Sequence, residues 1–379
     1  MHDAFRHRLH APIKNNTCPL AGQYGDFYWF SLQSLISVLN VGAILANGLF
    51  VYICARAGVM HLNMRLLLCT ISVCFAMEAL AGLLYNFYFF HLGFFGFPSR
   101  PVHSSLCSII NSTMVPWDAA TCLLMVAVGV ERLIATKHRI PSGAVSNYVK
   151  AIFILAWSAA IFVTVNFVLS LTDEGQCVCD GVSLSDRQSQ LLRISICAVV
   201  EAGTISLFGY VLILSRSEAD SLGINTAKYS LNQRFQIYEA YRSTEMLLPS
   251  AVLHAVLYLS YLCLIIPVRD LRAQRNLSVD QYNISTLVFA LPSLHALGHP
   301  IICLRKHYYL RQRVNEFFQY FKRKELKVVD VEGRTEKHYL NPTPDMSSSP
   351  SFRSDAGRIE FRIPPAASAR IMESFWMKK

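Results

Sequence analysis

Long runs of apolar residues, separated by shorter polar segments, recur along the chain. A helix needs about 20 consecutive apolar residues to cross the hydrocarbon core of a bilayer. The runs of this kind are residues 27–54, 66–90, 106–130, 151–171, 191–214, 246–268 and 284–304. The pattern predicts an all-α membrane protein in which residues 27–304 form a bundle of seven transmembrane helices.

The segments outside the bundle read differently. Residues 1–26 hold no apolar stretch of the signal-peptide type, so we expect an extracellular N-terminus and insertion by the first span. Residues 305–327 place aromatic residues and valine at helical spacing among many lysines and arginines, which predicts an amphipathic helix on the inner membrane surface. Residues 328–379 shift to serine, proline and charged residues, which predicts a disordered cytoplasmic tail.

Composition and charge support a membrane protein over a nucleic-acid-binding one. Of 379 residues, 53% are hydrophobic and 16% charged, and the net charge is +10. The basic residues lie in loops and in the tail, without the aromatic and basic face of a nucleic-acid groove. With the N-terminus outside, and with the C-terminal segment counted only to residue 327, 18 lysines and arginines fall on cytoplasmic segments, and nine fall on outer segments or at the outer end of a span. This bias predicts a multi-pass protein of the plasma membrane in that orientation.

The outer segments carry candidate modification sites. Glycosylation sequons that fall outside are at Asn15, Asn276 and Asn283. Most of the 11 cysteines lie within spans, where cysteine behaves as a small hydrophobic residue. The exceptions, at or beyond the outer surface, are Cys18, Cys107, Cys177 and Cys179. That compartment is oxidising, so a disulfide can form there.

The third span has cysteine at its outer edge and an acid–arginine pair at its inner edge. Cys107 and Arg132 are 25 residues apart, which is roughly 37 Å of helix and enough to cross a bilayer. In spacing and residue type this resembles the rhodopsin-like receptor plan. The resemblance implies a bridge from Cys107 to Cys177 or Cys179, and an electrostatic latch of Glu131 and Arg132 that rearranges when a G protein binds.

Other positions agree with that plan only in part. Asn47, Trp157 and Pro300 stand where such receptors carry asparagine, tryptophan and proline. The second span has no aspartate at its middle, however, and the sixth lacks a Cys-Trp-x-Pro motif.

The combination more closely resembles the nematode serpentine chemoreceptors of the Sra superfamily, which includes the Sra, Srab, Srb and Sre families. The resemblance rests on residues 61–68 (HLNMRLLL), 131–136 (ERLIAT), 230–239 (SLNQRFQIYE) and 299–300 (HP). It implies a sensory-neuron receptor that binds an environmental chemical and activates a heterotrimeric G protein. No cofactor is expected, and pairing with a second receptor stays open.

Residues 229–245, before the sixth span, have few helix breakers and repeat apolar residues every three to four positions. They predict a helix that extends from the membrane into the cytoplasm, with Arg234, Glu239 and Arg242 as part of a G protein surface. The alternative is an extension that only packs on its neighbours.

Polar side chains within spans are costly in a bilayer and are candidates for function. The candidate ligand-pocket residues are Asp118, Glu78, Asn86 and Glu201, with Asn166, His254 and His295 as further polar positions. The alternative for each is an interhelical hydrogen bond. Asp118 is the strongest candidate, because it lies 11 residues past Cys107 on a span expected to line the cavity.

Two other classes of protein compete with the receptor interpretation. A ligand-gated cation channel of the inverted seven-span odorant-receptor type would need the N-terminus inside, against the charge bias. A membrane enzyme or transporter would need a metal-binding or paired acidic motif, and no span carries one. His295 and His299 are four residues apart, but no third ligand is apparent, so we expect no metal site and no enzymatic activity.

Overall fold

The computed structural model describes residues 27–57, 60–95, 113–138, 147–169, 187–224, 231–272 and 286–329. Several predicted features lie outside these residues. They are the cysteines Cys107, Cys177 and Cys179, the sequons at Asn15, Asn276 and Asn283, and the tail from residue 330.

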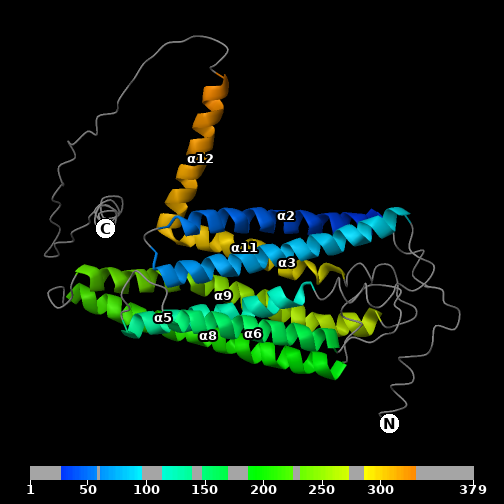
Figure 1. Cartoon of the computed structure of the whole chain (residues 1–379), viewed down its shortest axis with the longest axis horizontal. Coiled ribbons are helices and arrows are strands. Elements are labelled where there is room, and N and C mark those ends of the chain that lie inside the picture. The colour runs from blue at the N-terminus through cyan, green and yellow to red at the C-terminus, as the bar shows by residue number, and fades with distance from the viewer. Residues whose placement is uncertain are drawn as a thin grey trace, which may run out of the picture. The chain divides into compact units, whose positions relative to one another are not determined.

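The described residues form helices and contain no strand (Figure 1). The helices are α2 (Phe27–Ala55), α3 (Leu62–Phe95), α5 (Val115–His138), α6 (Asn147–Leu169), α8 (Arg187–Ile224), α9 (Leu231–Arg272), α11 (Ala290–Lys306) and α12 (Tyr308–Val329). The all-α prediction is therefore confirmed for this part of the chain.

Within the described ranges, six helices are long and apolar enough to cross a membrane: α2, α3, α5, α6, α8 and α9. The seventh predicted span corresponds to α11, whose 17 residues fall short of the roughly 20 that a bilayer requires. Helix α11 packs against α2, α3 and α9. A seventh membrane crossing therefore remains a prediction.

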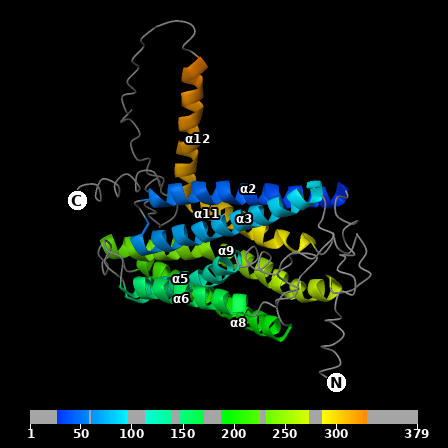
Figure 2. The same cartoon turned by 45° about the vertical axis from the view of Figure 1, so that its right-hand side comes forward.

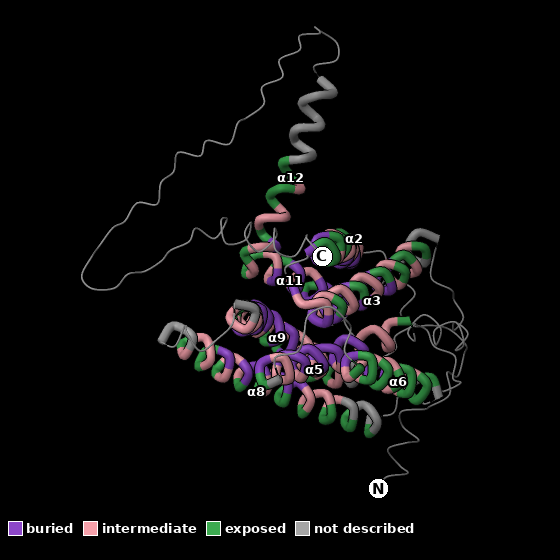
Figure 3. Tube along the Cα trace, turned by 60° about the vertical axis from the view of Figure 1, so that its left-hand side comes forward, coloured by how far each residue is buried: buried purple, intermediate pink, exposed green. Residues whose placement is uncertain are grey.

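Helix α5 lies at the centre of the bundle. It packs against α3, α6, α8 and α9, and the helices α2 to α11 run side by side in both Figures 1 and 2. In the most apolar stretch of α5, 61% of the residues are buried, against 17% in α6. Figure 3 shows this contrast as a largely buried α5 beside a largely exposed α6. Side chains that must be shielded from lipid are therefore best placed on α5.

The bundle exposes apolar side chains and buries polar ones. Phe162 on α6, and Val199 and Ile213 on α8, are each more than two-thirds exposed. Asn47 and Glu201 are fully buried. Lipid accepts the first group, and only the protein interior can satisfy the hydrogen bonds of the second. The chain is a multi-pass membrane protein.

Two helices extend beyond their predicted spans. Helix α9 begins at Leu231, so the segment before the sixth span continues into it without a break over 42 residues, as predicted. Helix α11 ends at Lys306, and His307 adopts an extended backbone before α12 begins at Tyr308. The basic residues Arg305 and Lys306 in the last turn of α11 suit the negative end of its dipole. The described residues 314–329 of α12 belong to a second unit.

Candidate functional site

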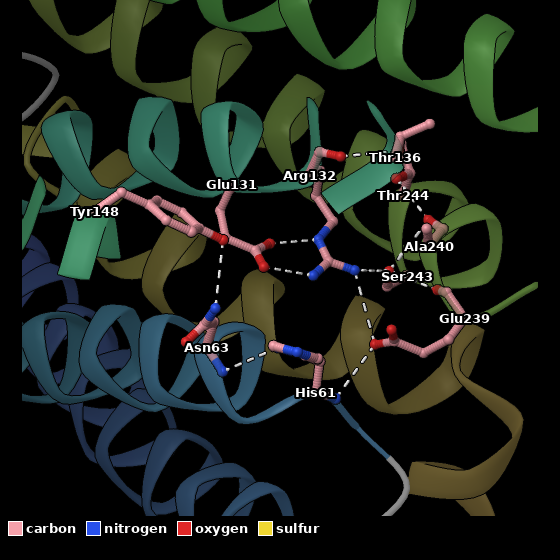
Figure 4. Close-up of polar contacts among 10 residues, drawn as sticks. All are labelled: His61, Asn63, Glu131, Arg132, Thr136, Tyr148, Glu239, Ala240, Ser243 and Thr244. Atoms are coloured by element: carbon pink, nitrogen blue, oxygen red, sulfur yellow. Dashed lines mark hydrogen bonds and ion pairs between the residues drawn. The ribbon is translucent and has the colours of Figure 1, made fainter. Parts of the chain in front are cut away.

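Arg132 is the centre of a buried polar cluster near the last turns of α5. Its Nε and Nη2 donate to the two carboxylate oxygens of Glu131, at 2.6 and 2.8 Å (Figure 4). Its Nη1 donates to Ser243 Oγ of α9 at 2.7 Å and lies 3.7 Å from Glu239 Oε1. Arg132 and Glu131 are fully buried. A charge-assisted pair on α5 is thereby tied directly to α9.

The start of α3 joins the same cluster. The backbone N–H of His61 donates to Glu239 Oε1 at 3.4 Å, and Asn63 Nδ2 donates to the hydroxyl of Tyr148 on α6 at 3.3 Å (Figure 4). Segments 61–68, 131–136 and 230–239, which carried the family resemblance, therefore meet at one site. Sequence reasoning did not single out Asn63, Tyr148 or Ser243. Ser243 lies one helical turn after Glu239, so the two share one face of the helix, and this spacing could have indicated Ser243 from the sequence.

The other predicted coupling residues of α9 lie differently from Glu239. Arg242 is exposed, and its guanidinium donates to Glu245 at 3.0 Å and to the Tyr238 hydroxyl at 2.9 Å. Arg234 is half-buried. Burial, reinforced by the charge of Arg242, lowers the pKa of His307 to about 4. His307 is therefore neutral at physiological pH, and Arg242 provides positive charge at the protein surface.

A crevice lies next to the Arg132 cluster, between α5, α8 and α9. It is too narrow to hold a water molecule, and Thr136, Glu218 and Ile237 are among its lining residues. Thr136 donates its hydroxyl hydrogen to the carbonyl oxygen of Arg132 at 2.8 Å. A shift of α9 away from α5 would widen this crevice and break the contacts of Arg132 with Ser243 and Glu239 at the same time.

A second, narrow pocket lies further along the bundle, between α3, α5, α9 and α11. Its free interior is about 10 Å³, room for about one water molecule. Its lining residues are Phe75, Glu78, Asp118, Thr121, His254, Tyr258, Pro292 and His295. Glu78 and Asp118, two of the predicted ligand contacts, both line this pocket.

The other two predicted ligand contacts lie outside this pocket lining. Asn86 Nδ2 donates to Ser37 Oγ of α2 at 3.2 Å, an interhelical hydrogen bond of the kind expected under the alternative interpretation. Glu201 is fully buried on α8, and its Oε1 lies 2.8 Å from Nε2 of His254. His254 lines the pocket, so Glu201 lies behind His254 and does not itself line the pocket.

These features define the class of the protein: a multi-pass helical membrane protein whose buried Arg132 cluster links the central helix to α9. No family model matches the chain. Its sequence is similar to serpentine receptor class alpha/beta-14 of Caenorhabditis elegans, with 26% identity over 280 residues, which cover 70% of this chain and 71% of that protein. This similarity confirms the resemblance to the nematode serpentine receptors.

Proposed function

We propose that the chain is a chemosensory G protein-coupled receptor with seven spans and its N-terminus outside the cell. The nematode relative is named a serpentine receptor, and the charge bias supports this orientation. The binding of a small molecule among the outer halves of the helices would shift the bundle between two states. A heterotrimeric G protein would bind the state that is open at the Arg132 cluster.

The observation that carries this proposal is the contact of Arg132 with α9. One guanidinium holds Glu131 on its own helix and Ser243 and Glu239 on another. Breaking only the contacts to α9 leaves Arg132 paired with Glu131, so the guanidinium keeps a counterion in both states. Such an arrangement suits a reversible latch, because opening it does not leave the buried guanidinium of Arg132 unpaired.

The narrow pocket is the candidate binding site for the chemical signal. Carboxyl groups from Glu78 and Asp118 lie near the aromatic rings of Phe75 and Tyr258. This combination favours a small ligand that has an apolar body and a cationic or hydrogen-bond-donating group. Asp118→Asn should weaken the response to such a ligand while leaving ligand-independent signalling unchanged.

The experiment that tests coupling is Arg132→Ala in a heterologous cell with a promiscuous G protein. Ligand-stimulated signalling should fall to background, while the amount of receptor at the cell surface stays near that of the wild type. The double variant Glu131→Gln, Arg132→Gln removes both charges of the pair together, so a loss of signalling there does not come from an uncompensated carboxylate at Glu131. Full signalling by both variants at matched surface levels would refute the latch.

Orientation has its own test. Epitope tags at the two ends of the chain should be accessible in unpermeabilised cells only at the N-terminus. An accessible C-terminal tag would favour the inverted channel arrangement instead and would contradict the receptor proposal.

A further inference from the structure

Three helices bring a thiol, a carboxylate and an imidazole together next to the narrow pocket. Cys122 of α5 lies with its Sγ 3.2 Å from Glu201 Oε1 of α8, and Nε2 of His254 on α9 lies 2.8 Å from the same oxygen. All three potential ligand atoms lie within 4.8 Å of one another, and all three residues are buried. No sequence motif predicts this cluster, because each of its three residues comes from a different helix.

Only one oxygen of the fully buried Glu201 carboxylate has polar neighbours. Oε1 contacts Cys122 and His254, whereas Oε2 has no hydrogen-bond partner among the described residues. Within the same residues, no lysine or arginine forms an ion pair with Glu201. A buried carboxylate paired through one oxygen alone is costly, and a bound cation is one way to compensate it.

His254 is oriented as a metal-binding histidine would be. Its Nε2 faces Glu201 without making a hydrogen bond, while its Nδ1 lies 3.0 Å from Nε2 of His295. Histidines that bind a metal through one ring nitrogen usually hold the other in a hydrogen bond, which fixes the tautomer and the orientation of the ring. His295 is well placed for this supporting role.

We propose that Cys122, Glu201 and His254 form a binding site for a zinc-type ion. Thiolate and imidazole ligands favour zinc over magnesium or calcium, and the carboxylate disfavours monovalent copper. With zinc–ligand bonds of about 2.0–2.3 Å, tetrahedral donor atoms are about 3.3–3.8 Å apart, so the side chains need to move by only about 1 Å.

Cys197 is a candidate fourth ligand, because it lies on α8 one helical turn before Glu201. With this thiol the site offers two sulfur atoms, one oxygen and one nitrogen. The narrow pocket, which His254 lines, borders the site.

The test uses the full-length receptor, purified in detergent after incubation with zinc chloride and removal of free ion. Mass spectrometry of the metal should find about one zinc per chain. Cadmium should give a thiolate-to-metal absorption band, and added zinc should raise the melting temperature of the wild type. Cys122→Ser and Glu201→Gln should each lose the bound ion and the zinc-dependent shift.

Matched controls separate this site from other cysteines and carboxyls. Cys303 is equally buried, on α11, and Glu78 is a buried carboxyl on α3. Cys303→Ser and Glu78→Gln should keep the full metal content. If one cluster variant fails to reach the membrane, the other cluster variant, compared with Cys303→Ser and Glu78→Gln, decides the question.

Two results would overturn the proposal. One is a wild-type receptor that takes up no zinc and gives no cadmium–thiolate band, which would leave a hydrogen-bonded cluster that only holds the helices together. The other is zinc bound equally by the wild type, Cys122→Ser and Glu201→Gln, which would place the ion elsewhere. Neither result depends on G protein coupling.

Discussion

At the scale of single residues, a buried amide side chain can join two helices through a specific hydrogen bond, which apolar contacts do not provide. Asn47 Nδ2 donates to the carbonyl of Ala43 on its own helix and to that of Ala296 on α11, both at 2.8 Å. Because lipid supplies no competing water, the helix-to-helix bond is the one that stabilises the bundle.

Asn47→Ala should therefore lower the free energy of unfolding by about 1 kcal/mol. Asn166→Ala is the matched control, since the Asn166 amide is exposed and, within the part of the chain that the structure describes, bonds only to the Phe162 carbonyl of α6. Thermal unfolding of the detergent-solubilised receptor measures both. Equal melting temperatures for the two variants would contradict the role given to Asn47.

Ser243 makes a second prediction at this scale. Its Oγ accepts from Arg132 and donates to the backbone carbonyl of Glu239 at 2.7 Å. Hydrogen bonds to charged groups contribute about 1.5–3 kcal/mol, so Ser243→Ala should raise ligand-independent signalling by roughly tenfold or more if the latch proposal holds.

The adjacent Thr244 gives the control for Ser243. It is also buried, but among the described residues its hydroxyl bonds only to the carbonyl of Ala240 on the same helix. Thr244→Ala should leave basal signalling at the wild-type level when surface amounts are matched. A Ser243→Ala receptor that signals no more than Thr244→Ala would count against the latch.

Sequence could predict some of these residues and not others. Glu131 and Arg132 are adjacent, and their place at the end of an apolar run marks them without a structure. Ser243 and Tyr148 are ordinary polar residues whose importance depends on which helices lie side by side. The cluster of Cys122, Glu201 and His254 was missed for the same reason, because its members are up to 132 positions apart.

At the scale of helices, the close approach of α5 and α8 depends on Gly129. A Cβ atom at this position would lie 2.7 Å from Cδ2 of Leu207 on α8. Small residues let helices approach closely in membranes. Gly129→Leu should push α8 away from α5 and lower the free energy of unfolding by about 1–3 kcal/mol.

The control for Gly129 lies on the exposed side of α8. Gly203 has open space around the position of a Cβ, so Gly203→Leu should have little effect on stability. Thermal unfolding again supplies the measurement. A Gly129→Leu receptor as stable as Gly203→Leu would show that α8 can shift at no cost.

The long apolar runs in the sequence predicted the positions of the long apolar helices well and the ends of those helices poorly. The sixth span begins at Leu231 as a helix, 15 residues before its apolar run starts at Met246. Polar residues continue a helix as readily as apolar ones do, so hydropathy locates the membrane and not the helix end. Helix α11 shows the opposite case, since its described length is shorter than the apolar run that predicted it.

At the scale of the whole molecule, α5 and α9 are joined at two places. Arg132 meets Ser243 at one, and Cys122 and His254 face Glu201 at the other. Along each helix the two places are 10 or 11 residues apart, or about 15 Å. Any separation of α5 from α9 must therefore disturb one connection or both.

If both proposals hold, a zinc ion bound at the second connection stabilises the closed arrangement of the first. A membrane-permeant zinc chelator should then raise ligand-independent signalling by the wild-type receptor, because removing the ion frees α9 from α5 and α8. Cys122→Ser should show raised signalling before chelation and no further increase after it, while Cys303→Ser should respond like the wild type. A wild-type receptor that holds zinc but signals equally with and without the chelator would show that the two connections are not coupled. The metal would then stabilise the bundle without affecting the latch.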